Sequence, residues 1–234
     1  MKRFYHTVGT REEDGVWRVT LDDRPLKTVR GAAQRVPTKA LANALAREWD
    51  IDGEELDPRA FPLRDMVDYT IDIVTSSRKE IADKLVAFAD TDTLLYRADP
   101  DDPLFQRQQE VWEPIVIAFE SRHDVSLRRV SGVVHAQQDE AAMRAVRDSL
   151  DTLDPFALTG LEAMTSLAAS LTIGMSALEP DADPLSLWGA ASLEEEWQAD
   201  AWGRDEEAEE RRRRRQTDFL RACEFTRLAR GTHT

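Results

Sequence analysis

Cysteine is almost absent from this 234-residue chain, in which Cys223 is the only one. A single thiol cannot close an intramolecular disulfide, and it offers no cysteine pair for a metal or redox centre. Cys223 shares an apolar helical stripe with Phe219, so the sequence predicts a core side chain rather than a nucleophile. The motifs G-x-S-x-G and H-E-x-x-H, the phosphate-binding loop and the dinucleotide glycine fingerprint are also missing. The sequence therefore gives no indication of an enzyme, and we expect no cofactor.

Positive charge and long apolar runs are scarce as well. The formal net charge of −14 argues against nucleic-acid binding, because a phosphate backbone attracts basic surfaces. The longest uncharged run, residues 163–178, is shorter than the roughly 20 apolar residues that cross a bilayer, so it predicts a buried helix and no membrane insertion. Residues 1–15 lack the apolar segment of a secretory signal. Arginine and alanine are common and lysine is rare, which favours a bacterial protein, and the single cysteine together with the lack of a signal segment favours the cytoplasm.

Secondary-structure patterns divide the chain near residue 40. The first forty residues contain short β-branched and aromatic runs, KRFYHTV, VWRVTLD, PLKTV and AQRVP, separated by turn-prone DG, DDRP and RG. Thr38 is a candidate helix cap, and Asp-Pro pairs indicate later helix starts. We expect an α+β fold with a small β domain (1–40) and a helical domain (41–234). The predicted helices lie near 38–52, 64–76, 78–88, 103–122, 138–152, 155–178, 184–203 and 205–229, and 126–134 is a possible further strand.

The predicted helix over 184–203 has two apolar faces. One stripe contains Trp188, Glu195, Gln198 and Trp202, and the opposite side contains Ala190, Leu193, Trp197 and Ala201. Only one face is needed to dock the helix onto its domain. Both faces could be buried, with Glu195 hydrogen-bonded inside, or the stripe with Trp202 could be a recognition surface, because tryptophans beside polar groups are common binding hot spots.

A run of five arginines, 211–215, follows nine carboxylates within residues 192–210. Pairs four residues apart in the favourable orientation predict a solvated, self-paired helix. These expected pairs are Glu207–Arg211, Glu209–Arg213 and Glu210–Arg214. The preceding carboxylates argue against nucleic-acid contacts by the arginines.

Histidine provides one match to the E-x-x-H spacing, from Glu120 to His123. A carboxylate-bridged metal site in a helical bundle needs two such pairs and further inward-facing glutamates. We therefore expect no metal site.

Four segments resemble a known family. They are RFYHTV (3–8) with VTLDDRPLKT (19–28), LANALAREWD (41–50), TDTLLYRADPDDPLFQRQQEVWEPI (91–115) and SLEEEWQADAWGRDEEAE (192–209). In this order and with this spacing they resemble the chaperones that assemble the F(1) sector of ATP synthase by binding its α subunit. The resemblance covers nearly the whole chain.

The resemblance implies an ATP-independent chaperone that holds unassembled α subunit, prevents its aggregation before it pairs with β, and is a monomer when free. It assigns partner binding to motif positions, among which we expect Trp49 to be structural and Glu195 to contact the client. With Trp188 from the helical stripe, the expected partner-binding residues are Trp49, Trp188, Glu194, Glu195, Gln198, Trp202, Asp205 and Glu206. Gly203 is a further motif position.

Two other functions remain as alternatives at this stage. A metal-assisted helical enzyme could use Glu120, His123 and the acidic block 194–210. An acidic adaptor could bind an unrelated basic protein, because the net charge is strongly negative.

Overall fold

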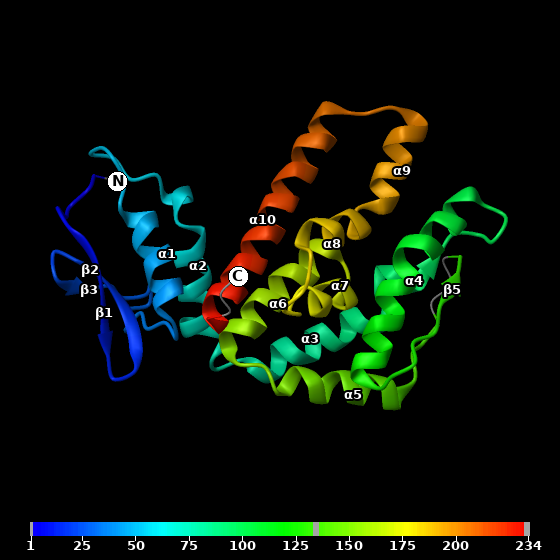
Figure 1. Ribbon diagram of the computed structural model, residues 1–234, viewed down its shortest axis with the longest axis horizontal. Coiled ribbons are helices and arrows are strands. Elements are labelled where there is room, and N and C mark those ends of the chain that lie inside the picture. Colours follow the sequence, from blue (N-terminus) through cyan, green and yellow to red (C-terminus); the bar gives the residue numbers. More distant parts are fainter. Residues whose placement is uncertain (1, 133–135, 232–234) are drawn as a thin grey trace. The chain divides into compact units, whose positions relative to one another are not determined.

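The computed structural model describes residues 2–132 and 136–231 (Figure 1). The chain forms two compact units. Unit 1 comprises residues 1–78, 154–160 and 224–234, and unit 2 comprises residues 79–153 and 161–223. A small sheet near the N-terminus and mainly helices after it confirm the predicted α+β class. The expected domain boundary between residues 40 and 41 stays a prediction.

The sheet of unit 1 is an antiparallel meander of β1 (Val8–Glu13), β2 (Val16–Leu21) and β3 (Arg24–Pro25). Two-residue turns, Asp14–Gly15 and Asp22–Asp23, connect the strands. All four turn residues have φ between 48° and 76°, as tight hairpins require. The expected turns are confirmed, whereas the strands expected around PLKTV and AQRVP are reduced to β3 and isolated bridges.

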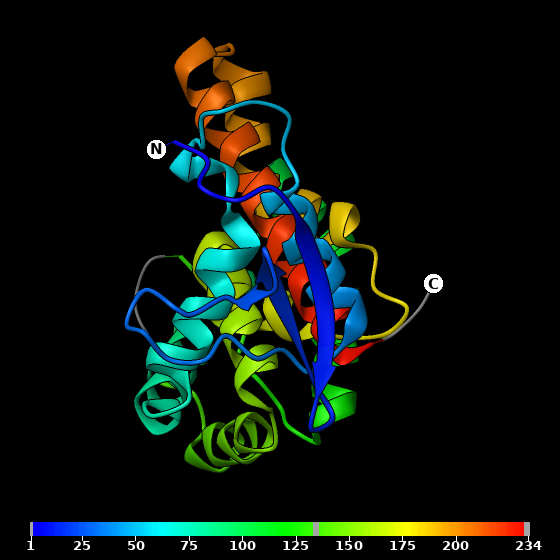
Figure 2. The ribbon, with the colours of Figure 1, turned by 90° about the vertical axis from the view of Figure 1, so that its left-hand side faces the viewer.

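Helix α1 (Lys39–Trp49) packs against β1 and β2 (Figure 2). Its buried side chains belong to the unit 1 core. Thr38 caps this helix as expected, because its hydroxyl accepts a hydrogen bond from the Leu41 amide at 3.1 Å. Leu41 and Leu45 are buried in one cluster with Val19 of β2. The other helical elements of this unit are the 3-10 turn η1 (Pro58–Ala60), α2 (Pro62–Tyr69), the π-helical turn η2 (Thr70–Val74), the start of α6 (Pro155–Ala168) and the end of α10 (Glu206–Arg230).

Unit 2 is mainly helical. Its elements are α3 (Arg78–Asp90), η3 (Thr93–Leu95), β4 (Tyr96–Arg97), α4 (Pro103–His123), β5 (Val130–Ser131), α5 (Glu140–Asp151), most of α6, α7 (Leu171–Ser176), α8 (Pro184–Ala191), α9 (Leu193–Trp202) and most of α10. Strands β4 and β5 form a short parallel pair. Trp112, Phe119 and Phe219 are the largest of its fully buried side chains.

Aspartates before prolines cap helices as the sequence predicts. The carboxylates of Asp102, Asp154 and Asp183 accept hydrogen bonds from the amides two residues further on, at 2.8, 2.8 and 3.1 Å. In each case proline occupies the first helical position, where its missing amide hydrogen costs nothing.

The prediction of one helix over 155–178 is wrong, because the helix is interrupted between α6, which ends at Ala168, and α7, which begins at Leu171. Ala169 has a φ of 50°, and the hydroxyl of Ser170 accepts from the Ile173 amide at 3.0 Å to cap α7. The buried carboxylate of Asp92 accepts from the Thr172 amide at 2.8 Å. A contact from a distant segment therefore fixes this break.

Most of the uncharged stretch 163–178 is buried as expected, although Ser166 and Ala169 are exposed, and Met164, Leu171 and Ile173 have no exposed surface. None of the described helices combines the length and apolar character needed to cross a membrane. Of the possible strand over 126–134, only β5 is present among the described residues, and 133 and 134 lie outside them.

Candidate functional site

The helix expected over 184–203 is divided at Ser192. Helix α8 ends at Ala191, and the amide and hydroxyl of Ser192 both donate to the carbonyl oxygen of Trp188, at 2.9 and 2.8 Å. Helix α9 then begins at Leu193. Trp188 is therefore not on the same helix as Glu195, and the expectation that one continuous stripe carries both is wrong.

Trp188 lies in the core rather than on a surface, with 3% of its area exposed. Its ring centroid is 5.5 Å from that of Phe219, and the guanidinium of Arg215 lies 5.5 Å from the indole. Such cation–aromatic contacts orient the arginine as well as the ring. Trp188 of α8 therefore packs against α10 through both of these contacts.

Helices α9 and α10 enclose a groove of about 350 Å³. We call its lining the α9–α10 surface, which comprises Glu195, Gln198, Ala199, Trp202, Gly203, Asp205, Ala208, Glu209, Arg211, Arg212 and Arg215. Four predicted partner-binding residues, Glu195, Gln198, Trp202 and Asp205, are brought together there. The Trp202 side chain is 82% exposed, which is unusual for the largest apolar residue type. Glu206, the first residue of α10, is also exposed.

Gly203 makes the turn that presents Trp202. Its φ of 100° lies in the region that favours glycine, and its amide closes α9 with a hydrogen bond to the Ala199 carbonyl at 2.9 Å. Two residues later the Asp205 carboxylate caps α10 by accepting from the Ala208 amide at 2.8 Å. The W-G-x-D spacing therefore places an indole and a carboxylate on either side of one tight turn.

Ion pairs link α9 to α10. Arg215 pairs with Glu195 at 2.7 Å, and Arg212 pairs with Glu196 at 3.2 Å. Arg204, between the two helices, contacts Glu196 at 3.2 Å, and also Asp200 and Glu209. Arg215 further donates to a carbonyl of α6, that of Leu167, at 2.9 Å. Two residues of the arginine run, Arg212 and Arg215, therefore attach α9 to α10, whereas others, such as Arg211 and Arg214, are exposed to solvent.

Two of the three predicted pairs within α10 are confirmed, Glu207–Arg211 at 2.6 Å and Glu210–Arg214 at 2.9 Å. The third is wrong. Glu209 pairs with Arg204 and Arg212, while Arg213 pairs with Glu210 at 2.8 Å. Arg204 precedes α10, so the spacing of residues within the helix could not show that it competes with Arg213 for Glu209.

Glu194, in the first turn of α9, is half-buried against α4 and does not line the groove. The buried Gln108 of α4 donates from its amide nitrogen to Glu194 at 2.6 Å. Burial raises the pKa of Glu194, and the hydrogen bond from Gln108 opposes this shift only in part. One turn further along α4, the Trp112 indole donates to the Ala190 carbonyl at 2.7 Å. Gln108 and Trp112 together hold the α8–α9 junction. This role was not predicted from the sequence, although a spacing of four residues places both side chains on one face of a helix.

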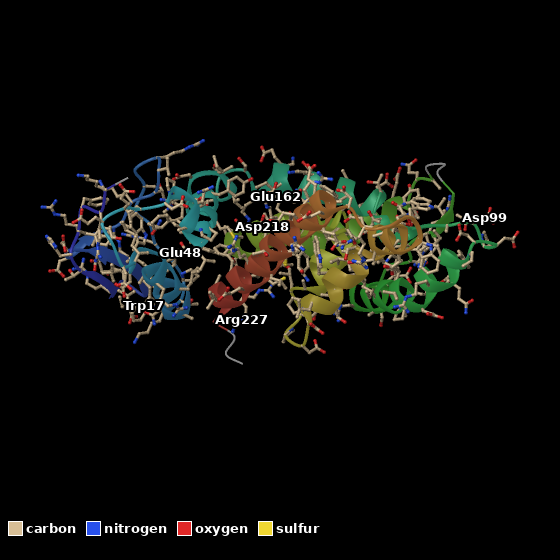
Figure 3. All side chains as sticks on the ribbon, turned by 90° about the horizontal axis from the view of Figure 1, so that it is seen from above. Trp17, Glu48, Asp99, Glu162, Asp218 and Arg227 are labelled. Carbon is tan, nitrogen blue, oxygen red and sulfur yellow. The ribbon has the colours of Figure 1, made fainter. Side chains whose placement is uncertain are left out.

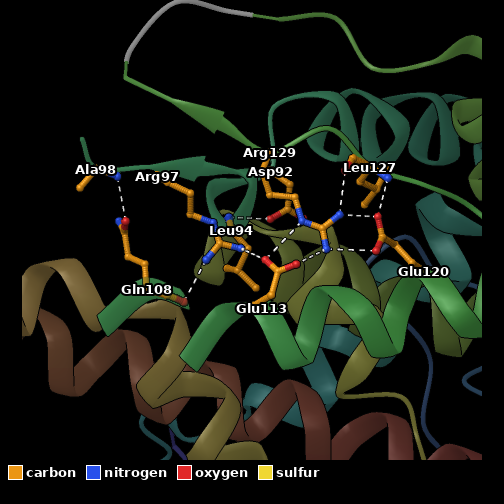
Figure 4. A network of polar contacts seen from close by, with 9 residues as sticks. All are labelled: Asp92, Leu94, Arg97, Ala98, Gln108, Glu113, Glu120, Leu127 and Arg129. Atoms are coloured by element: carbon orange, nitrogen blue, oxygen red, sulfur yellow. Dashed lines mark hydrogen bonds and ion pairs between the residues drawn. The ribbon is translucent and has the colours of Figure 1, made fainter. Parts of the chain in front are cut away.

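A partly buried charge network lies along α4 (Figure 4). Arg97 pairs with Glu113 at 3.0 Å and donates to the Gln108 carbonyl at 2.9 Å. Arg129 of the segment before β5 bridges Glu113 and Glu120, with contacts at 2.7 and 3.0 Å. This network ties the T-D-x-L-x-Y-R segment to α4.

The Glu120 carboxylate and the Nδ1 atom of His123 both contact other protein groups. Burial alone would raise the pKa of Glu120, but hydrogen bonds from Arg129 and the Leu127 amide lower it below its usual value. The His123 ring contacts the Ser149 hydroxyl at 3.2 Å. Among residues 2–132 and 136–231 there is no cluster of three side chains suited to hold a metal ion.

Trp49 lies in the core of unit 1, at 5% exposure, with its ring 4.6 Å from that of Phe61. The preceding residue, Glu48 (Figure 3), accepts from the Leu63 and Arg64 amides at 2.7 and 2.9 Å and so binds the start of α2. The E-W pair therefore joins α1 to α2 within unit 1.

Cys223 is buried as predicted, and its sulfur lies 3.3 Å from that of Met164. Burial raises the pKa of this thiol to about 12, so it stays protonated at neutral pH.

Comparison with known proteins gives a consistent result. The model of the ATP12 chaperone protein family matches residues 2–120. Mitochondrial Atp12 of Schizosaccharomyces pombe is 28% identical over 222 residues, which cover 89% of this chain and 76% of that protein. The crystal structure of Atp12 from Paracoccus denitrificans is 35% identical, covers 97% of this chain and 98% of that one, and superposes with a TM-score of 0.93. A mutant of the same protein gives the same identity and TM-score.

Proposed function

The chain belongs to the ATP12 chaperone family, and we propose that it binds the unassembled α subunit of the ATP synthase F(1) sector. Binding keeps this client from aggregating until it pairs with the β subunit. The family is one of chaperones and not of enzymes, so the metal-enzyme alternative is not retained. The chaperone acts without ATP, as a monomer when free, in the cytoplasm of a bacterium, which corresponds to the mitochondrial matrix.

The observation that carries the proposal is the exposure of Trp202 at the mouth of the groove between α9 and α10. Its 82% exposed indole provides an apolar anchor of the kind that dominates the binding energy of protein interfaces. An unassembled subunit presents the complementary apolar surface. We therefore assign the first client contact to Trp202.

The charges around Trp202 suit a complex that must later dissociate. Glu195 and Arg215 are 48% and 42% exposed, so their ion pair adds little stability and can be exchanged for client charges at low cost. Exposed carboxylates increase the association rate with basic patches more than they increase affinity. Displacement by the β subunit then requires no nucleotide hydrolysis.

The predicted residues take two roles in this proposal. Glu195, Gln198, Trp202, Asp205 and Glu206 contact the client. Trp49, Trp188 and Glu194 are buried or half-buried and hold the fold that presents these contacts.

Co-purification tests the proposal. Tagged α subunit should capture the wild-type chain, and tagged β subunit should not. Trp202→Ala should weaken capture by about 2 kcal/mol, and Glu195→Lys should weaken it at unchanged helical content. Glu207→Lys is the matched control, because Glu207 is exposed on the same helix pair and lies outside the groove. Equal capture of the wild type and Trp202→Ala would refute the proposed surface.

A further inference from the structure

Unit 2 has a second groove, which is lined by other residues than the α9–α10 surface. It runs between α4 on one side and the end of α7, the segment 179–183 and α8 on the other, and its volume is about 480 Å³. None of its lining residues belongs to the α9–α10 surface. We call it the α4–α8 groove.

The floor of the α4–α8 groove is apolar. Val111, Pro114, Ile115 and Ala118 line it from α4, and Leu187 lines it from α8. The same two helices also expose two large aliphatic side chains, Ile117 at 54% and Leu185 at 59%. These two side chains do not line the groove itself, but they extend the exposed apolar surface of the two helices that form it.

The rim of the groove is acidic. Four carboxylates line it, Glu110, Glu179, Asp181 and Asp183, against one cation, Arg122, which leaves three excess negative charges. Arg122 pairs with Glu179 at 3.2 Å, Arg107 pairs with Glu110 at 3.2 Å, and Asp183 caps α8. Asp181 is exposed and forms no ion pair with any residue in the described part of the chain.

Pro114 adds a backbone acceptor to this acidic environment. Proline has no amide hydrogen, so the Glu110 carbonyl cannot receive the usual helical hydrogen bond from position 114. A carbonyl oxygen without its helical donor, beside carboxylates, favours a cationic donor from outside.

We propose that the α4–α8 groove binds an amphipathic helix of a protein partner, with an aliphatic face flanked by lysine or arginine. The apolar floor takes the aliphatic face, and the rim carboxylates and the Glu110 carbonyl take the cations. A membrane surface is the wrong partner, because the acidic rim repels anionic headgroups. This site goes beyond the proposed client contact and does not depend on it.

Fluorescence anisotropy with the full chain and a synthetic helical peptide tests the proposal. The probe is a labelled peptide of about 18 residues built from leucine, alanine and lysine, with the lysines flanking a leucine face. One control peptide has the same composition in scrambled order, and another has glutamate in place of lysine. We expect the amphipathic lysine peptide to bind at least about tenfold more tightly than either control.

Ala118→Arg should weaken binding of this peptide about tenfold or more, because it fills the groove and adds a positive charge that repels the lysines of the peptide. Ala87→Arg, at an exposed alanine of α3 outside the groove, is the matched control and should bind as the wild type does. Asp181→Lys changes only an exposed side chain and provides a second test if Ala118→Arg folds poorly. Equal binding by Ala118→Arg or Asp181→Lys and the wild type, or an equal loss in Ala87→Arg, would overturn the proposal. A loss in Trp202→Ala alone would place the peptide on the α9–α10 surface and would also overturn it.

Discussion

Two arginine clusters of unit 2 use the same ion-pair chemistry at opposite degrees of burial. In the network of α4, the Arg97 side chain is 1% exposed and reaches Glu113, a backbone carbonyl and the Trp112 ring. Between α9 and α10, Arg204 and Arg215 are 50% and 42% exposed. A desolvated ion pair cannot lose one partner without a large penalty, whereas an exposed pair can exchange partners. The comparison assigns the buried Arg97, and also Arg212 of α10 at 13% exposure, to the fold. It assigns the exposed Arg204 and Arg215 to recognition.

The largest expected effect is on stability, from the buried cluster. Arg97→Met removes the side-chain donor to the Gln108 carbonyl and leaves Glu113 with one cation fewer, and should lower the free energy of unfolding by about 3 kcal/mol. Arg214→Met, at a side chain 74% exposed, should lower it by less than about 0.5 kcal/mol. Urea denaturation of both variants checks this, and similar losses in the two would remove the distinction between the clusters.

A smaller effect on stability is expected at the turn of the exposed cluster. Gly203→Ala forces a residue with a Cβ into a φ of 100°, which should cost about 2 kcal/mol and shift Trp202. Gly189→Ala in α8 is the matched control, because a Cβ there meets nothing within 4 Å and φ is ordinary. That control should be as stable as the wild type or more so. A stable Gly203→Ala with unchanged α-subunit capture would show that the turn does not position the binding residues.

The smallest expected effect is on how the free energy of unfolding changes with pH, to which Glu194 and Glu120 should contribute with opposite signs. The folded-state pKa of Glu194 is raised, so the stability linked to it is present below the unfolded pKa and is lost as pH rises. The pKa of Glu120 is lowered, so its contribution is present at neutral pH and is lost as pH falls.

The two glutamine variants separate these contributions. Relative to the wild type, Glu194→Gln should gain stability between about pH 4 and pH 7, whereas Glu120→Gln should lose it. Urea denaturation at the two pH values measures both differences. The same sign in both variants would contradict the assigned environments.

Local sequence signals predicted the features that depend on neighbouring residues. The Asp-Pro caps, the Asp14–Gly15 turn and the Thr38 cap each depend on side chains within a few positions, and all three are present. The helix breaks at Ala169 and Ser192 could not be predicted in this way. Asp92 and Gln108, many residues earlier in the chain, provide the hydrogen bonds that accompany these breaks.

The sequence predicted several residues that line the groove between α9 and α10, but it did not predict the break between α8 and α9. The helical period placed Glu195, Gln198 and Trp202 together correctly, because all three lie within α9. It placed Trp188 with them wrongly, because the period assumed an unbroken helix. The α4–α8 groove had no sequence signal, since its two walls are distant in the chain and meet only through tertiary packing.

Hydrogen–deuterium exchange of the chain with and without α subunit tests the central claim most directly. If the α9–α10 surface binds the client, amides of residues 193–215 should exchange more slowly in the complex, with the greatest protection around the turn that carries Trp202. A stable complex in which this segment exchanges as fast as in the free chain would contradict the account.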